Sequence, residues 1–225
     1  TTFRGAAGRS FRTPTLYDLY RTWKYGSTTY QSNPDLKPEK AYSYEIGVDQ
    51  EIGEQVLARI TGYYNDVSDL IYSLGGTTKI KQNVGKVQIY GIETDMRADI
   101  FRWLSVFSNY TFNISKIMKH SDMSLKGKYL TYTPRNKYSI GGIFKIPKIA
   151  DIEVAARHIG HVFNNDANTQ KIKDYFVLDF TLSRKFTDNF DLSIKVENAA
   201  DKRYLEYWDT VAPDRMISAR VTVRF

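Results

Sequence analysis

The chain has 225 residues, of which 42% are hydrophobic and 25% are charged, and its formal net charge is +7. No apolar run is long enough for a membrane helix, which excludes a helical membrane protein but leaves room for a β-barrel with a polar lumen face. The basic residues are scattered among 25 acidic ones, which disfavours nucleic-acid binding, and the lack of cysteine excludes disulfides and thiolate metal sites.

Apolar and polar residues alternate with a period of two in about ten stretches, a pattern that predicts β-strands with one apolar and one polar face. In the last stretch, for example, Ala219, Val221 and Val223 alternate with serine, arginine and threonine residues. Most stretches are around ten residues long, the length of a tilted strand that crosses a bilayer. The predicted strands are residues 1–11, 42–52, 55–65, 90–100, 103–114, 136–146, 151–159, 175–186, 191–198 and 215–225.

The connections between these strands alternate between long and short, which is typical of an up-and-down barrel with one periplasmic and one extracellular end. The fold class we predict is therefore an all-β, antiparallel, up-and-down transmembrane β-barrel. Aromatic residues beside the short turns would join an aromatic girdle; they are Phe101, Phe186, Phe190 and Phe225. The long connections are residues 12–41, 66–87, 115–135, 160–174 and 199–214, and the short ones are 53–54, the break near 101, 147–150 and 187–189.

Five segments resemble motifs of the TonB-dependent outer-membrane receptors, in the order expected for that family. They are FRTPTLYDLY (11–20), NPDLKPEKAYSYEIG (33–47), YGIE (90–93), VENAADKRY (196–204) and APDRMISARVTVRF (212–225). Two mild departures are Asp214, where the family usually has glycine, and the pair Ala199–Ala200, where bulkier residues are usual. The motif positions, to which we assign structural roles, are Phe11, Arg12, Pro14, Leu16, Asn33, Pro34, Leu36, Pro38, Glu39, Gly91, Glu93, Asn198, Asp201, Tyr204, Arg215 and Phe225.

The resemblance implies a larger protein than the chain at hand. Such receptors hold an N-terminal plug inside a barrel of roughly 22 strands, so residues 1–225 would be the C-terminal portion of the barrel, without the plug and the N-terminal strands. The implied location is the outer membrane, and the implied partners are outer-membrane lipid and lipopolysaccharide, the cargo, and a TonB complex that acts through the plug. A ferric siderophore is the first choice of cargo and cobalamin the second.

The motif segments also have local physical consequences. Pro14 and Pro34 restrict the backbone, and Asn33–Pro34 favours a turn. We expect a short helical turn around Leu16 to Tyr20 that covers part of the barrel mouth. Asn198 and Asp201 are expected to cap the backbone where the chain leaves the wall.

Aromatic and cationic residues in two long connections are the candidates for cargo contact, because stacking and cation–π contacts suit an anionic, ring-bearing chelate. The alternative is that these aromatics anchor the loops at the membrane interface and that the cations meet lipopolysaccharide phosphates. The candidates are Tyr20, Arg21, Trp23, Lys24, Tyr25 and Tyr30 in the first connection and Arg203, Tyr204, Tyr207 and Trp208 in the last.

Motifs for catalysis, a metal or a cofactor are lacking, so we expect neither enzymatic activity nor a cofactor. His158 and His161 are three residues apart, which on a strand places them on opposite faces. The interval between Thr13 and Ser32 contains no histidine; haem receptors with similar motifs place one there, so haem is disfavoured as cargo. Alternative hypotheses are a complete small barrel acting as a pore, a structural protein or a rim protease built around His158, His161 and Asp166, and a soluble β-sandwich binding module.

Overall fold

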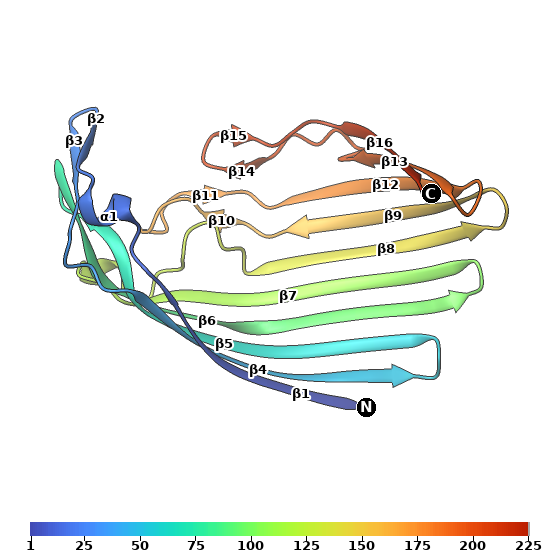
Figure 1. The fold of residues 1–225 in the computed structure, drawn as a ribbon, viewed down its shortest axis with the longest axis horizontal. Coiled ribbons are helices and arrows are strands. Elements are labelled where there is room, and N and C mark those ends of the chain that lie inside the picture. The colour runs from blue at the N-terminus through green and yellow to red at the C-terminus, as the bar shows by residue number, and fades with distance from the viewer. Residues whose placement is uncertain (225) are drawn as a thin grey trace.

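The structure, a computed structural model, describes residues 1–224 and consists mainly of one antiparallel β-sheet (Figure 1). Its long strands pair in chain order, each with the next, which confirms the predicted all-β, up-and-down arrangement. The expectation for Phe225 falls outside the described residues. The long strands are β1 (Thr2–Arg12), β4 (Glu39–Ile52), β5 (Val56–Leu74), β6 (Thr78–Phe101), β7 (Leu104–Lys119), β8 (Asn136–Ile146), β9 (Ala150–Ile159), β12 (Tyr175–Lys185), β13 (Phe190–Glu197) and β16 (Met216–Val223).

Four of the connections contain further short elements. Within residues 1–224 the helical segments are one α-helix and one turn of 3-10 helix, and neither is long and apolar enough to cross a membrane. The helical turn expected near Leu16 is present as α1. The short elements are α1 (Leu16–Tyr20), β2 (Trp23–Tyr25), β3 (Thr28–Gln31), a 3-10 turn (Met123–Leu125), β10 (Val162–Phe163), β11 (Lys171–Ile172), β14 (Leu205–Tyr207) and β15 (Thr210–Val211).

The strand register gives the sheet two chemically different faces. On one face Ile46 pairs with Gly62, which pairs with Ile92, whereas on the other face Asp49 pairs with Arg59. The apolar face is bare: Ile46 is 72% exposed and Ile92 is 48% exposed. A β-sandwich would cover that face with a second sheet, so the exposure argues against the soluble alternative.

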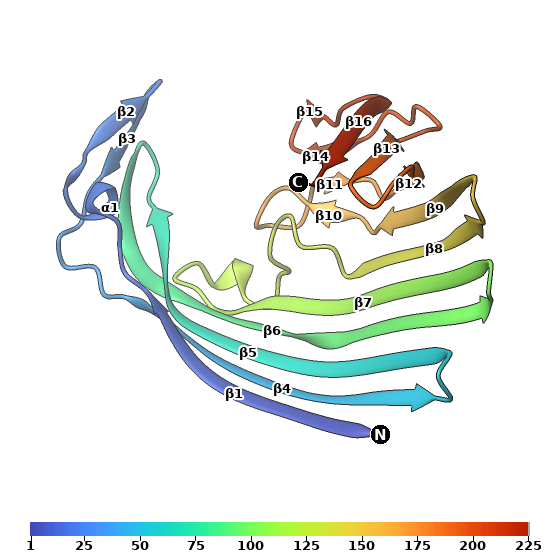
Figure 2. The same cartoon turned by 45° about the vertical axis from the view of Figure 1, so that its right-hand side comes forward.

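The prediction of a long connection at residues 66–87 is wrong. β5 continues to Leu74 and β6 begins at Thr78, so the connection is a three-residue turn at the tip of a long hairpin (Figure 2). The register shifts around Ser68 and Leu70, where Asp69 has a positive φ of 59°. A bulge of this kind inserts an extra residue and shifts the phase of the alternation. For that reason the sequence pattern did not predict the half of the hairpin that lies beyond the bulge.

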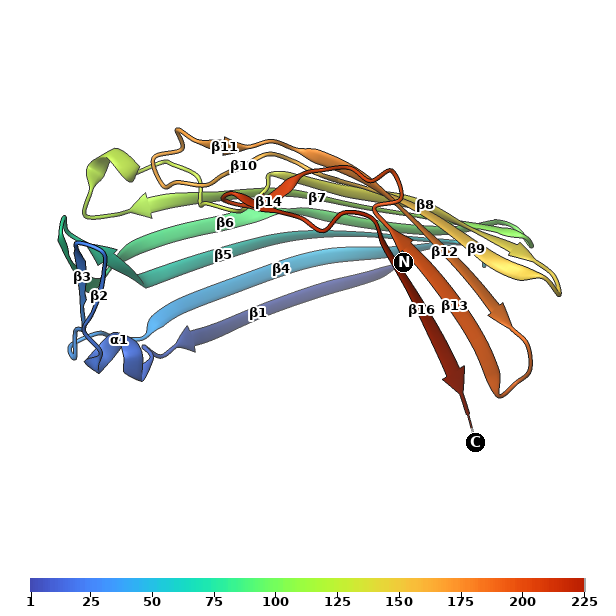
Figure 3. The same cartoon turned by 90° about the horizontal axis from the view of Figure 1, so that it is seen from above.

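The sheet is curved and open rather than closed. β1 and β16 are its two edge strands, and among the described residues no pairing joins them. The sheet also twists, so that β13 and β16 run at an angle to β1 and β4 (Figure 3). The order of strands is therefore that of a barrel wall, and the structure does not show the complete small barrel of the alternative hypothesis.

Candidate functional site

The connections that carry the candidate residues all leave the sheet at one end (Figure 1). That end holds α1, the β2–β3 hairpin, the tip of the β5–β6 hairpin and the hairpins β10–β11 and β14–β15. The opposite end has short turns between β4 and β5, β6 and β7, β8 and β9, and β12 and β13. We call the first the loop end and the second the turn end.

An ion pair fixes the start of the first long connection to the sheet. The Arg12 guanidinium donates to the Glu39 carboxylate, with Arg12 Nε 2.6 Å from Glu39 Oε2. Glu39 is buried and also accepts a hydrogen bond from the Ile71 backbone N–H at 3.0 Å. Two motif residues, which lie at the two ends of the connection, thus meet and hold it closed at its base.

Helix α1 has a complete capping box. The Thr15 hydroxyl accepts from the Asp18 backbone N–H at 3.1 Å, and the Asp18 carboxylate accepts from the Thr15 N–H. This reciprocal pairing gives partners to two backbone N–H groups at the start of the helix. The capping residue Thr15 directly follows Pro14. The Asp18 carboxylate also forms an ion pair with Lys81 of β6, which fastens α1 to the β5–β6 hairpin.

The electrostatic environment of Asp18 favours its charged form. Burial alone would raise the pKa of Asp18, but the hydrogen bonds from Lys81 and Thr15 outweigh it and hold the pKa below its usual value. The carboxylate is therefore ionised across the physiological pH range, and the α1 anchor is formed there.

Hydrogen bonds to β6 also hold the second motif segment. The Asn33 side-chain amide donates to the Lys81 carbonyl at 2.8 Å, and Asn83 of β6 bonds both the N–H and the carbonyl of Lys37. Leu36 is buried between these contacts at 8% exposure. The segment from Asn33 to Glu39 is thus a rigid return to the sheet.

Aromatic rings of the first connection form a cluster, which we call the N-terminal aromatic cluster and which consists of Tyr17, Trp23 and Tyr30. Trp23 stacks on Tyr30 with ring centroids 4.4 Å apart and planes 9° apart, and Tyr17 meets Trp23 edge-on at 6.3 Å. Three cations lie over these rings: Arg21 and Lys81 over Tyr17, at 5.0 and 5.6 Å, and Lys79 over Tyr30, at 5.6 Å.

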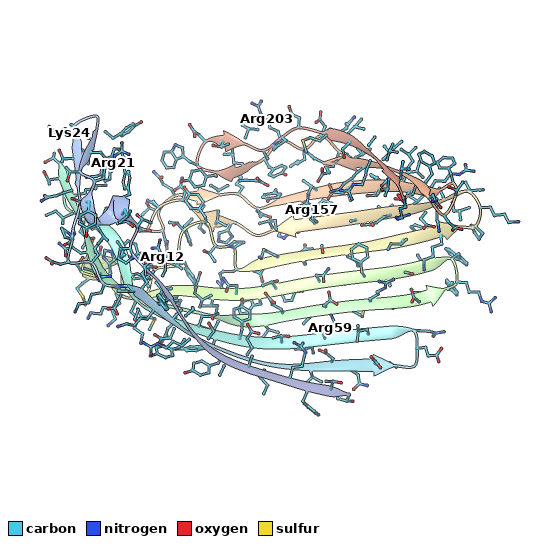
Figure 4. The ribbon with its side chains drawn as sticks, in the orientation of Figure 1. Arg12, Arg21, Lys24, Arg59, Arg157 and Arg203 are labelled. Carbon is cyan, nitrogen blue, oxygen red and sulfur yellow. The ribbon has the colours of Figure 1, made fainter. Side chains whose placement is uncertain are left out.

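The remaining candidates of this connection surround the cluster. Tyr25 lies 6.4 Å from Trp23 and is 75% exposed, and Tyr20 is 68% exposed. Lys24 is exposed on β2. Arg12, Arg21 and Lys24 gather at the α1 end of the molecule (Figure 4). The structure therefore brings all six candidates of the first connection to one place.

A second group of rings, the C-terminal aromatic cluster, consists of Tyr132, Tyr175, Tyr204 and Tyr207 and joins two connections and β12. Tyr204 stacks on Tyr175 at 4.0 Å and Tyr207 stacks on Tyr132 at 4.4 Å. A pocket of about 180 Å³ lies between them, lined in part by Tyr132, Tyr175 and Glu206. Burial and the nearby Glu206 carboxylate raise the pKa of Tyr204, so its hydroxyl stays neutral. The candidates Arg203 and Trp208 lie exposed at this group.

Several residues of this region were missed in the sequence. The Tyr129 ring stacks with the Phe163 ring, with ring centroids 6.2 Å apart. The charged groups of Lys116 and Arg135 lie 5.2 and 5.4 Å from the centre of the Tyr129 ring. Lys171 lies 5.4 Å from the Phe163 ring. The high aromatic content of the connections was the only sign of these residues in the sequence. Their contacts could not be predicted, because they depend on how two separate loops fold toward each other.

The two aromatic clusters are separate in this structure. Among residues 1–224, no hydrogen bond, ion pair or ring contact joins the N-terminal cluster to the C-terminal one. Figure 4 shows the separation, with Arg21 and Lys24 at α1 and Arg203 at β14. Both clusters nevertheless lie on the loop end of the same sheet.

Gly91 and Glu93, the motif pair of β6, lie on the polar face. A side chain at Gly91 would clash with the Phe112 carbonyl and with the Tyr63 hydroxyl. That hydroxyl crosses over Gly91 and donates to Asn113 Oδ1 at 2.8 Å. The glycine therefore permits a bond between β5 and β7 that spans the strand between them.

The last motif residues organise the turn after β13. Asn198 is 4% exposed and has a positive φ of 50°, and its side chain accepts from the Lys202 N–H and donates to the Lys202 carbonyl. Its own N–H donates to Asp179, which forms an ion pair with Arg157 at 2.9 Å. Asp201 accepts from the Arg215 N–H at 2.8 Å, which connects the two ends of the last long connection.

The histidines do not form a common site. His158 stacks on Tyr138 and lies 3.1 Å from Asp174, and its hydrogen bond lowers the pKa of Asp174. His161 instead meets the Phe163 ring edge-on. In the part of the chain that the structure describes, no three His, Asp or Glu side chains could hold a metal together. Among the described residues no hydrogen bond or ion pair joins Asp166 to His158 or His161, and the carboxylate that pairs with His158 is that of Asp174.

Comparisons with known proteins place this arrangement among receptor barrels. Residues 1–199 match the family model described as TonB dependent receptor-like, beta-barrel. The chain is 27% identical to the Vitamin B12 transporter BtuB of Photobacterium profundum, over 97% of this chain and 34% of that protein. It is 23% identical to the Iron-regulated outer membrane virulence protein of Vibrio cholerae, over 61% of this chain and 23% of that protein.

Solved structures with low identity share the fold. A mutant of the ferric enterobactin receptor PfeA of Pseudomonas aeruginosa superposes with a TM-score of 0.78 at 16% identity, over 99% of this chain and 38% of that one. The copper transporter OprC gives a TM-score of 0.78 at 18% identity, over 98% of this chain and 36% of that one. The chain thus spans about a third of the length of these relatives.

Proposed function

The chain belongs to the TonB-dependent receptor β-barrel family, and from this premise we propose that it forms part of an importer of a bulky nutrient. Members of this family are outer-membrane β-barrels of Gram-negative bacteria, and this chain would lie in that membrane. Residues 1–225 would be the C-terminal portion of the barrel, and the plug and the N-terminal strands would belong to the rest of a longer protein. β1 and β16 would then pair with neighbouring strands of that protein.

One observation carries this proposal: the single-layered sheet has a bare apolar face, a charged polar face and its long connections at one end. In a membrane barrel the apolar face contacts lipid and the polar face contacts the lumen. Rings at the turn end suit the aromatic girdle of such a barrel. Trp103 stacks between Phe101 and Phe144, and Phe186 lies 5.3 Å from Phe190.

The cargo we propose is a ferric siderophore first and cobalamin second. Rings flanked by cations can hold an anionic chelate by stacking and cation–π attraction, and the N-terminal aromatic cluster combines the two. A relative named for vitamin B12 and a structural neighbour named for ferric enterobactin support these two classes. The residues proposed to contact cargo are Tyr20, Arg21, Trp23, Lys24, Tyr25, Tyr30, Arg203, Tyr204, Tyr207 and Trp208.

The energy for import would come from a TonB complex acting through the plug. The wall described here would position the loops and enclose the plug, and it would neither gate nor couple by itself. No catalytic step is part of this proposal.

Growth of a deletion strain on a panel of ferric siderophores and cobalamin tests the proposed function. We expect the strain to lose uptake of one compound and to regain it when the full-length gene is returned. Unimpaired uptake of every compound on the panel would overturn the import proposal.

A further inference from the structure

The pocket of about 180 Å³ at the loop end is built where three connections meet. The strands β10, β11 and β14 lie side by side there (Figure 1 and Figure 3). The start of β12 and the connection between β7 and β8 complete the wall. The pocket is therefore a product of how these connections fold onto one another.

Aromatic rings form part of the wall of this pocket. Tyr175 and Tyr132 line it, and each of them is held by a stacked partner, Tyr204 at 4.0 Å and Tyr207 at 4.4 Å. Much of the remaining lining consists of isoleucine, valine, leucine and proline side chains. A group that enters the pocket would thus meet two ring systems and apolar carbon atoms.

A carboxylate, that of Glu206, faces these rings. The Tyr175 hydroxyl donates to Glu206 Oε1 at 3.4 Å, and burial together with the Glu206 charge raises the pKa of Tyr204. Arg157 acts on Tyr204 in the opposite direction, but its own charge is matched by Asp179 at 2.9 Å. No ion pair among residues 1–224 involves Glu206. Its negative charge therefore lacks a cationic partner there.

The lining of the pocket also includes a cation, Lys173. This residue follows β11, in which Ile172 is buried and the Lys171 ammonium lies 5.4 Å from the Phe163 ring. Because side chains alternate along an extended chain, Lys173 continues the side of Lys171, and it is exposed. This alternation assigns the Lys173 ammonium to the rim of the pocket.

We infer that this pocket binds an alkylammonium group of the cargo, with the positive charge between the Tyr132 and Tyr175 rings and the Glu206 carboxylate. Cations are attracted to the faces of aromatic rings, and the attraction grows when water is displaced. The apolar wall suits the carbon atoms attached to the nitrogen. An anionic group would instead be repelled by Glu206.

The inference deepens the proposed function and rests on it, because cargo reaches the loop end only if the protein is an importer. The N-terminal aromatic cluster has cations over its rings and suits an anionic group. The pocket combines rings with a carboxylate and suits the opposite charge. The two ends of the loop region thus differ in the charge that they select.

Titration of the purified full-length receptor with two small probes tests the inference. The probes are choline and 3,3-dimethylbutan-1-ol, in which a carbon atom replaces the charged nitrogen of choline. Saturation-transfer NMR in detergent, without cargo, measures both dissociation constants. We expect choline to bind roughly tenfold more tightly than its uncharged isostere. Equal affinity for the two probes, or no binding of choline, would overturn the inference.

Variants identify the groups that hold the charge. Glu206→Gln should bind choline roughly tenfold more weakly and should keep its affinity for the uncharged isostere, which reports that the pocket is intact. The matched control is Asp209→Asn, an exposed carboxylate at the turn between β14 and β15. Equal choline binding by these two variants would contradict the role of Glu206.

The rings and the lysine are tested in the same way. Tyr132→Leu should weaken choline binding severalfold, whereas Tyr132→Phe, which keeps the ring, should lose less. Lys173→Gln should bind choline at least as tightly as the unmodified receptor, because it removes a positive charge from the rim. Weaker choline binding by Lys173→Gln, or equal losses in the two Tyr132 variants, would overturn the inference.

The assignment of the ammonium group to the cargo has its own test. Glu206→Gln should raise the concentration at which the compound identified by the growth panel is taken up, and Asp209→Asn should not. Unchanged uptake by Glu206→Gln would overturn this assignment. The choline titration contains no cargo, so its failure is distinguishable from failure of the import proposal, which the growth panel measures.

Discussion

The Tyr63 hydroxyl of β5 donates to Asn113 Oδ1 of β7 at 2.8 Å, over the backbone of Gly91 in the intervening strand. The bond connects alternate strands on the polar face, where ordinary cross-strand pairs connect only neighbours. It explains physically why the YGIE segment has glycine at this position.

Replacing Gly91 by alanine should therefore destabilise the receptor. The new Cβ would overlap with the Phe112 carbonyl oxygen and with the Tyr63 hydroxyl, so backbone and ring must both move. We expect a loss of about 1–3 kcal/mol in the free energy of unfolding, measured by denaturant unfolding in detergent. Gly62→Ala is the control, since its nearest contact would be 3.9 Å away. Equal effects of the two substitutions would contradict the explanation.

The anchor between Asp18 and Lys81 should depend on pH in a defined direction. The pKa of Asp18 in the folded chain is below its unfolded value of about 4. Its contribution to stability is therefore fully present above that value and is lost as the pH falls through the folded pKa. Hydrogen exchange of the α1 amides in the full-length receptor should show protection that declines only in this acid range.

Asp18→Asn should remove that dependence. The asparagine cannot pair with the Lys81 charge, so we expect local protection of α1 to fall by about 2 kcal/mol at neutral pH and to change little on acidification. Asp35→Asn in the same connection is the control, because no described hydrogen bond or ion pair involves the Asp35 carboxylate. An acid transition that persists in Asp18→Asn would assign the titration to another group.

The strands were predictable because a strand with one apolar and one polar face leaves a local signature in the sequence, the period of two. The same rule failed where the bulge at Asp69 shifts the phase, since a local pattern cannot report an inserted residue. Contacts such as Arg12 with Glu39 and Asp18 with Lys81 join residues 27 and 63 positions apart. The motif resemblance marked three of those four residues as parts of motif segments without revealing their partners, which only the folded sheet brings together.

Candidate cargo residues were predicted by type and location, but their pairing was not. The stack of Trp23 on Tyr30 follows from a local hairpin and was within reach of sequence reasoning. The stacks of Tyr207 on Tyr132 and of Tyr204 on Tyr175 join segments that only the strand order places side by side. For that reason Tyr132 and Tyr175 were not among the candidates.

Asn198 should prove essential to the last long connection. Its side chain and backbone make bonds to Lys202 and Asp179 within a buried site. Asn198→Ala keeps the backbone bond to Asp179 but leaves the N–H and the carbonyl of Lys202 without their side-chain partner, and we expect a loss of about 2–3 kcal/mol in unfolding free energy. Asn109→Ala, which removes only one exposed hydrogen bond of 3.3 Å, is the control. Similar stability of the two variants would show that the turn forms without the Asn198 side chain.

The N-terminal aromatic cluster should determine cargo affinity through its rings. Trp23→Ala removes the stack on Tyr30 and the edge contact with Tyr17, and we expect roughly tenfold weaker binding of the compound that the growth panel identifies. Trp23→Phe, which keeps an aromatic face, should lose less. The control is Trp103→Ala, another half-exposed tryptophan stacked between two rings but at the turn end. If Trp103→Ala weakens cargo binding as much as Trp23→Ala, the effect reflects the barrel's stability and not contact with cargo.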